Sequence, residues 1–214
     1  MVNITQELDQ DKALALAREV MRQEGETLQA LAAGLGDGFW ECAQVLIRCP
    51  GLIWVTGVGT SAAVGERFAH ILTGCGARSM FLSPADGLHG HTGVMAPADV
   101  LIAMSRGGES SEVNQMVEIA NRRGVTTMAF VHNTGSSLAQ SCGYVLPIRS
   151  LQEHELMGYL ATTSTVAFCA MCDALCAVVL EAKGYTAEQF AATHPGGAVG
   201  QVLGSTGAAG EVAR

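Results

Sequence analysis

Residues 103–112 read Ala103-Met104-Ser105-Arg106-Gly107-Gly108-Glu109-Ser110-Ser111-Glu112, and the elements on both sides of them indicate the class of fold. The apolar run Asp99–Met104 leads into it and predicts a short buried strand. Behind it, apolar residues at helical spacing predict a helix over 110–123. The stretch is therefore a turn from strand to helix, in which Gly107 and Gly108 let the backbone bend tightly.

The same turn carries hydroxyl groups and the free N–H groups of a helix N-terminus, where the helix dipole favours anions. We expect a phosphate group to bind there. Glu109 places a carboxylate beside that phosphate, which a simple anion trap would not need, and so it indicates chemistry. The alternative is purely structural, because Ser and Glu are common capping residues at the start of a helix.

Around this turn the chain alternates strands and helices. Such alternation predicts βαβ units, a parallel sheet covered on both faces, and right-handed crossovers that give a doubly wound α/β layer. We expect one domain over residues 1–204, with two helices ahead of the first strand, and a flexible tail over 205–214. The expected helices are 4–23, 26–48, 62–74, 110–123, 161–183, 188–192 and a last one to about Leu203, and the expected strands are 52–56, 78–82, 99–104, 125–131 and 144–147.

Composition narrows the class of protein. Of the 214 residues, 49% are hydrophobic and only 15% are charged, an apolar excess that buried subunit interfaces would explain. The formal net charge is -8 without a basic cluster, which argues against nucleic acid and acidic membranes as partners. The apolar run Val166–Leu180 is interrupted by Asp173 and is too short to span a bilayer, and no secretory signal is seen at the N-terminus.

The seven cysteines have irregular spacing, do not form a disulfide framework, and are typical of buried thiols in a cytosolic protein. Cys169, Cys172 and Cys176 share one face of the expected helix 161–183. Core packing is the better interpretation of this face, because no second pair of metal ligands accompanies it. We therefore expect a cytoplasmic protein with no cofactor and no bound metal.

In an open α/β sheet, ligands bind beyond the carboxyl ends of the strands. Four segments should meet there: Gly57–Ser61, 83–93, Ser105–Ser111 and 149–165. The first belongs to the pattern G-x-G-x-x-A over Gly57–Ala62, a dinucleotide fingerprint. No acidic residue follows the second strand to hold a ribose, so a sugar- or phosphate-binding turn is favoured over a dinucleotide site.

The fourth segment holds Glu153, His154 and Glu155, followed by Thr162-Thr163-Ser164-Thr165. Four hydroxyls that open an apolar helix predict a second phosphate cradle, with helix capping as the structural alternative. Glu109 and Glu153 form a possible carboxylate pair for moving a proton between C1 and C2 of a sugar. Burial or a like charge can raise the pKa of such a carboxylate toward neutrality.

Three histidines stand beside these segments. His89 and His91 could ligate a metal, although two ligands are not a site and contacts with a substrate fit the pattern equally well. His194 lies in Thr193-His194-Pro195-Gly196-Gly197, next to a turn, where a lone histidine is usually structural.

Together these segments resemble the sugar isomerase (SIS) domain family, and within it the arabinose-5-phosphate isomerases. The resemblance covers about residues 25–204. Hydroxyl-rich loops are general to SIS domains, whereas the last matching segment is specific to that group. The matching segments are Val55-Thr56-Gly57-Val58-Gly59-Thr60-Ser61, Leu88-His89-Gly90, Ser105–Glu112, Ala161-Thr162-Thr163-Ser164-Thr165, and Phe190 through Thr193 to His194-Pro195-Gly196-Gly197-Ala198.

The resemblance implies a three-layer α/β sandwich with a five-stranded, parallel, flavodoxin-like sheet. It also implies a homotetramer that interconverts aldose and ketose phosphates through a cis-enediol. Glu153 would be the proton-shuttling base, with Glu109 and His194 assisting ring opening and proton transfer and His194 lent by a neighbouring subunit. The residues expected to hold the phosphate and the sugar are Gly59, Thr60, Ser61, His89, Ser105, Arg106, Gly108, Ser110, Ser111, Thr162, Thr163, Ser164 and Thr165.

The chain departs from the family pattern mainly in its charged residues. Thr60 stands where the family has an active-site lysine, and Arg106 and Gly107 stand where its central loop has an uncharged residue and a serine. His91 stands where the family usually has an acidic residue, and we expect the tandem CBS domains of longer members to be absent. Because arginine binds phosphate, carboxylate or sulfonate through two hydrogen bonds, we expect Arg106 to replace the charge of the missing lysine.

We thus expect a homo-oligomeric isomerase of a phosphorylated or otherwise anionic sugar. One alternative is a non-catalytic sugar-phosphate sensor, favoured by the missing lysine and disfavoured by the presence of Glu109, Glu153 and His194. The sequence predicts no basic helix-turn-helix of the kind a transcription regulator uses. A further alternative is an isomerase of another anionic sugar, either a phosphoheptose or a sulfonated or acid sugar.

Overall fold

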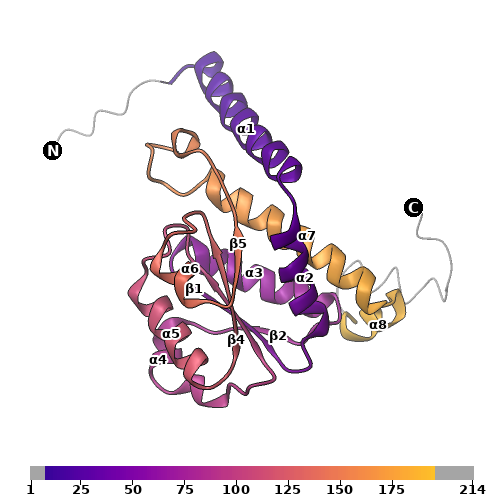
Figure 1. Ribbon diagram of the computed structural model, residues 1–214. Helices are drawn as coiled ribbons and strands as arrows, with labels where there is room; N and C mark the ends of the chain where they lie inside the picture. The colour runs from indigo at the N-terminus through magenta and orange to yellow at the C-terminus, as the bar shows by residue number, and fades with distance from the viewer. Residues whose placement is uncertain (1–7, 196–214) are drawn as a thin grey trace.

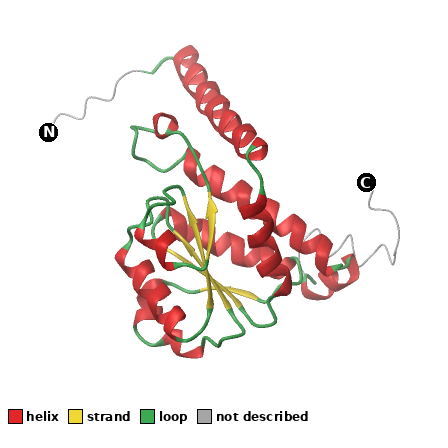
Figure 2. Ribbon diagram, in the orientation of Figure 1, coloured by secondary structure: helices red, strands yellow, loops and turns green. Residues whose placement is uncertain are grey.

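A five-stranded sheet forms the centre of the molecule, whose computed structural model describes residues 8–195 (Figure 2). The expected helix to Leu203 and the tail 205–214 lie outside that range. All neighbouring strands are parallel, in the order β2-β1-β3-β4-β5. The strands are β1 (Ile53–Gly57), β2 (Ser79–Phe81), β3 (Val100–Met104), β4 (Thr126–Val131) and β5 (Tyr144–Pro147), each within one residue of its predicted bounds.

Helices cover both faces of this sheet. The helices of the described residues are α1 (Gln10–Ala33), α2 (Asp37–Arg48), α3 (Thr60–Gly74), α4 (Pro84–Leu88), α5 (Ser111–Arg122), α6 (Ser137–Ser141), α7 (Thr163–Lys183) and α8 (Ala187–Thr193), with 3-10 turns η1 (His91–Val94) and η2 (Gln152–His154).

Alternate strand residues point to opposite faces, and both faces are apolar, which is why the sheet is buried on two sides. On one face Val55, Ile102 and Phe130 pack with α2, α3 and α7. On the other face Leu101 and Ala129 pack with α5 and α6. The expected three-layer α/β sandwich is therefore confirmed.

α1 extends beyond the sheet (Figure 1), and it contacts α7 and η2. The sequence predicts a break between two helices near residue 25, and this is wrong: α1 runs through Gly25 to Ala33. A single glycine inside a helix costs only about 1 kcal/mol, which the rest of the helix absorbs. The chain turns instead at Gly34–Gly36, where the Gly34 N–H donates to carbonyls of the last turn. Thr27 is the one buried residue of α1.

α7 is the most apolar helix of the fold. Its 21 residues are long and apolar enough to cross a membrane by length and composition alone, which corrects the expectation drawn from the shorter run within it. Half of its most apolar window is nevertheless buried in the fold. Phe168, Cys172 and Leu175 belong to the core beneath it, and Cys169 packs against that core. The apolar composition of α7 is therefore that of a helix packed in the core, and its cysteines pack there as predicted.

Candidate functional site

Three of the four segments expected at the carboxyl edge of the sheet meet there. Thr60 and Ser61 begin α3 after β1, Arg106 follows β3, and Ser164 and Thr165 lie in the first turn of α7. All five residues line one niche. The niche is narrow, about 20 Å³, which is room for one water-sized group. It can enclose the end of an anion while the remainder of a ligand lies outside it.

Ser105 organises the turn after β3. Its buried hydroxyl accepts a hydrogen bond from the Gly108 N–H at 3.1 Å and lies 3.2 Å from the Ser110 hydroxyl. Gly108 has φ 73°, and a Cβ there would lie 2.0 Å from the Ser136 hydroxyl, so only glycine fits. Ser110 is the N-cap of α5, which Ser111 begins, yet it makes no side-chain capping bond. The first N–H groups of α5 therefore remain free of this side chain and can meet an anion.

The hydroxyl-rich start of α7 already carries a carboxylate, that of Glu155. The residue as a whole is 4% exposed, and its side chain accepts hydrogen bonds from the N–H groups of Thr162 at 2.7 Å and Ser164 at 3.0 Å. Burial alone would raise the pKa of Glu155, but the Ser164 hydroxyl, the two N–H groups and Arg106 together lower it below its ordinary value. Glu155 thus stays charged and occupies the place predicted for a phosphate.

Arg106 supplies the positive charge beside that carboxylate. Its Nε lies 3.6 Å from Glu155 Oε1, and its side chain is 31% exposed while that of Glu155 is fully covered. The Arg106 carbonyl accepts a hydrogen bond from the N–H of His132 at 3.0 Å, which fixes the backbone of the arginine to the end of β4. Burial lowers the pKa of His132, and the positive charges of Arg106 and Arg149 lower it further. His132 therefore lies beside two guanidinium groups, while the Glu155 carboxylate acts on its pKa in the opposite direction.

Glu109 faces the start of α6. Its carboxylate accepts hydrogen bonds from the N–H of Ser137 at 2.9 Å and from the Ser137 hydroxyl at 2.7 Å. These two bonds lower the pKa of Glu109. In the single chain Glu109 therefore acts as a capping group for a neighbouring helix, and its side chain is not among those that line the niche.

Glu153 lies on a turn held between two helices. It belongs to η2 and is exposed. The next residue, His154, has its Nδ1 3.5 Å from the Thr27 hydroxyl of α1, and its carbonyl accepts a hydrogen bond from the Thr163 hydroxyl of α7 at 2.8 Å. Glu153 thus stands at the same edge as the niche, on a fixed turn two residues from Glu155. Sequence reasoning quoted Glu155 but gave it no role.

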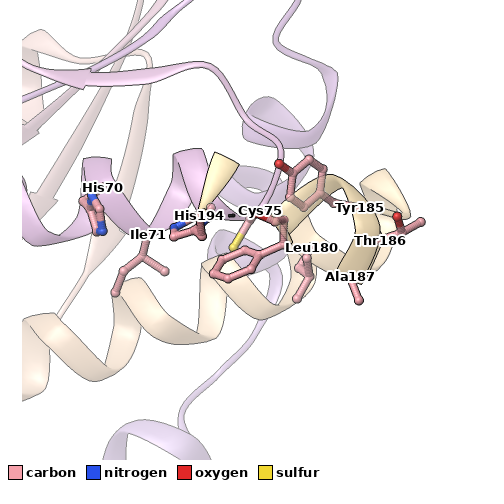
Figure 3. A pocket seen from close by; sticks show the side chains of 10 residues that line it. His70, Ile71, Cys75, Leu180, Tyr185, Thr186, Ala187 and His194 are labelled. Carbon is pink, nitrogen blue, oxygen red and sulfur yellow. Dashed lines mark hydrogen bonds between the residues drawn. The ribbon is translucent and has the colours of Figure 1, made fainter. Parts of the chain in front are cut away.

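His194 lies far from the niche within one chain. It stacks on Phe190 with ring centroids 3.8 Å apart. Both rings line an apolar cavity of about 510 Å³ beside His70 and Cys75, at the C-terminal end of α3 (Figure 3). The niche lies at the first residues of the same helix, and the 14 steps from Thr60 to Gly74 span roughly 21 Å at about 1.5 Å each. A single chain does not bring His194 to the niche.

The remaining candidates lie outside the niche. His89 follows α4 and His91 begins η1, and both are exposed. His91 lines a separate cavity of about 540 Å³ beside β2. Within residues 8–195 no group of three or more His, Cys, Asp or Glu side chains is placed to hold a metal ion. Gly59 lies in the turn between β1 and α3. It has φ 58° and forms the N-cap of α3.

Comparison with known proteins shows the family of the chain. The SIS domain family matches residues 46–178. Arabinose 5-phosphate isomerase KdsD of Escherichia coli strain K12 is 34% identical over 186 residues, which are 87% of this chain and 57% of that protein. The KdsD of Pseudomonas aeruginosa is 33% identical over 202 residues, 94% of this chain and 61% of that protein. The chain thus spans less than two thirds of the length of these relatives.

Solved structures give the same result. A putative sugar-phosphate isomerase from Listeria monocytogenes superposes with a TM-score of 0.85 at 27% identity, over 89% of this chain and all of that one. A protein of Escherichia coli CFT073, solved in complex with arabinose 5-phosphate, superposes with a TM-score of 0.84 at 25% identity, over 88% of this chain and all of that one. On the match to well over half of its residues, the chain belongs to the SIS domain family.

Proposed function

We propose that this protein is an aldose–ketose isomerase of a phosphorylated sugar of the arabinose 5-phosphate class. The observation that carries the proposal is the convergence of Thr60, Ser61, Arg106, Ser164 and Thr165 at one niche, with Glu153 at the same edge. Hydroxyls and a guanidinium suit a phosphoryl group, and a nearby carboxylate suits proton transfer. The similarity to arabinose 5-phosphate isomerases supports the same assignment.

The reaction needs no external oxidant or reductant, because the substrate and the product are isomers. The Glu153 carboxylate takes the proton from C2 of the open-chain aldose, and the electron pair forms the C1–C2 double bond of a cis-enediol as O1 gains a proton. The O2 hydroxyl then loses its proton, C2 becomes the carbonyl carbon, and Glu153 returns a proton to C1. Glu109 and His194 assist ring opening and the transfers at oxygen.

A neighbouring copy of the chain completes this site. His194 lies at the far end of α3 from the niche of its own chain, so its contribution requires a second subunit. Glu153 is exposed in the single chain, whereas a carboxylate base works best when burial brings its pKa toward neutrality. We therefore include a homo-oligomer, with four copies expected, in the proposed function, and place it in the cytoplasm.

Proton NMR in D2O tests the proposal. The purified protein is mixed with a panel of aldose and ketose phosphates, and deuterium is expected at C2 of one aldose and C1 of its ketose as the two interconvert. Glu153→Gln should lower this exchange by at least about a hundredfold, since it removes a general base. Glu118→Gln, an exposed carboxylate on α5, is the matched control and should leave exchange unchanged.

Other outcomes decide against parts of the proposal. Shifts of the sugar signals without exchange or conversion would indicate a sugar-phosphate sensor instead of an enzyme. Exchange that survives Glu153→Gln would remove Glu153 from the role of base. A panel without shifts or exchange would exclude phosphorylated sugars of this class, and sulfonated and carboxylated sugars would then be the next class to examine.

A further inference from the structure

Glu155 is the most completely buried carboxylate at the candidate site. Besides the N–H groups of Thr162 and Ser164, the Thr162 hydroxyl lies 3.4 Å from it. The loop around it is fastened to α7 on both sides, because the Leu156 N–H donates to the Thr162 hydroxyl at 3.3 Å and the Thr163 hydroxyl donates to the His154 carbonyl at 2.8 Å. Its carboxylate therefore has a fixed position.

A second anion has no place beside this carboxylate at the start of α7. Glu155 already uses two of the N–H groups that a phosphate would need there. A phosphate on the remaining groups would stand next to a like charge in a poorly solvated place, which is unfavourable. The positive group left for the anion of a substrate is Arg106, which also lines the niche.

Glu155 is placed to orient the guanidinium group of Arg106. Within residues 8–195 its buried Nε has no hydrogen-bond acceptor, and Glu155 Oε1 at 3.6 Å is its ion-pair partner. An unpaired arginine side chain samples many rotamers, so an ion pair at its Nε restricts the guanidinium. Because the pair uses the Nε side, the two Nη groups are left for a ligand in the niche.

We propose that Glu155 is a positioning residue that aims the Arg106 guanidinium at the substrate's phosphate, so that the pair does the work expected of the family lysine that Thr60 replaces. The proposal rests on the proposed function, since it names how that site holds its anion. It differs from the expectation that the start of α7 cradles the phosphate.

The direction in which one substitution changes phosphate affinity distinguishes a positioning role of Glu155 from an effect of its charge alone. Glu155→Gln keeps the shape of the side chain and removes a negative charge close to the bound anion. If Glu155 acted only through its charge, the variant would bind phosphate more tightly. If Glu155 aims Arg106, the variant should bind phosphate more weakly, because the guanidinium loses its ion-pair partner.

Calorimetric titration of the full chain with inorganic phosphate and with arabinose 5-phosphate measures the direction of this change. We expect Glu155→Gln and Arg106→Ala each to weaken both ligands by about tenfold or more, the usual effect of losing a charge-assisted hydrogen bond. In the double variant, Glu155→Gln should add less than about twofold to Arg106→Ala, because the two residues act as one unit. Glu118→Gln is the matched control and should bind as the unaltered protein does.

Three results would overturn the inference: tighter or unchanged binding in Glu155→Gln, an equal loss with and without Arg106, or no binding of either ligand by the unaltered protein. Circular dichroism and thermal unfolding show whether each variant is folded. Arg106→Lys gives an independent test, since it leaves Glu155 in place and keeps the charge but lacks Nε; retention of full affinity there would also overturn the inference. Binding without isomerisation would defeat the proposed function while leaving this inference testable.

Discussion

Gly107 and Gly108 are neighbours with opposite requirements. At Gly108 the positive φ and the Ser136 hydroxyl exclude a side chain, whereas an added Cβ at Gly107 meets nothing within 4 Å. We expect Gly108→Ala to lower the free energy of unfolding by at least about 1–3 kcal/mol, and Gly107→Ser to change it by less than about 0.5 kcal/mol. Urea unfolding measures both. Equal losses in the two variants would contradict the distinction.

Asp99 is a buried carboxylate with a structural role. It accepts hydrogen bonds from the N–H groups of Leu52 at 2.8 Å and Ala96 at 2.9 Å and from the Trp54 indole at 2.9 Å. We expect Asp99→Ala to lower the free energy of unfolding by about 3 kcal/mol or more, because each buried donor left without an acceptor costs about 1–3 kcal/mol. The control is Asp173→Ala, whose half-exposed pair with Arg67 is worth less than about 1 kcal/mol.

Thermal and urea unfolding of both aspartate variants measure these two losses of stability. A loss in Asp99→Ala no larger than that in Asp173→Ala would show that the three hydrogen bonds are replaced by water.

At the residue scale the sequence predicted three of the segments that meet at the niche, but not that Glu155 is the carboxylate buried at the start of α7. Residue types alone did not distinguish Glu153 from Glu155, and the resemblance to the SIS family selected Glu153 as the base. Only the folded turn shows that the side chain of Glu155 points to the α7 N-terminus while Glu153 remains exposed. A carboxylate a few residues ahead of a hydroxyl-rich helix start was the available signal, because such N-termini attract anions.

The start of α7 makes stability depend on pH. The pKa of Glu155 is lower in the folded chain than its ordinary value of 4.5. The unfolded chain therefore binds the proton more readily than the folded chain. The stability that the Glu155 carboxylate contributes is complete above the ordinary pKa, and it is lost as pH falls through the pKa of the folded chain. We expect the free energy of unfolding to fall more steeply below about pH 4.5 in the unaltered protein than in Glu155→Gln.

Urea unfolding at a series of pH values from neutral to acidic compares the two slopes. Asp99 and other carboxylates contribute equally to both proteins, so the difference between the curves isolates Glu155. Parallel curves would mean that Glu155 does not titrate differently in the folded chain.

Strands and most helices with a clear apolar pattern were predictable, whereas the shortest helices and the boundary between α1 and α2 were not. The strands and α3, α5, α7 and α8 agree closely with their apolar patterns, since a buried face imposes its period on the sequence. α4, α6, η1 and η2 have five residues or fewer, too short to show a helical period, and no pattern predicted them. The break after α1 was misplaced because glycines at several positions looked equally able to end a helix.

At the scale of the whole molecule, α1 contacts α7 and η2 but leaves most of its apolar side chains exposed in the single chain. Leu14, Leu16 and Met21 are 42%, 54% and 72% exposed on it. A 24-residue helix with one buried residue gains little stability from its own chain, so we expect it to pack against another copy. Light scattering after size-exclusion chromatography should give a multiple of 22.2 kDa, with four copies expected.

A variant with Leu16→Glu and Met21→Glu should give a lower mass, because charges cannot be buried in an apolar contact. Gln115→Glu, on an exposed face of α5, is the control and should keep the mass of the unaltered protein. A mass of one chain before any substitution would exclude the oligomer and, with it, the contribution of His194 from a neighbour.

The order of elements along the chain also bears on α7. All five strands, α2 and α3 precede it, so during synthesis on the ribosome the surface that α7 covers is made before α7 emerges. A 21-residue apolar helix that emerged first would offer membrane-insertion machinery a suitable segment. Here the nascent sheet is already available as its partner. A circular permutant that begins with α7 loses this protection, and its product should divide between folded protein, aggregates and the membrane fraction.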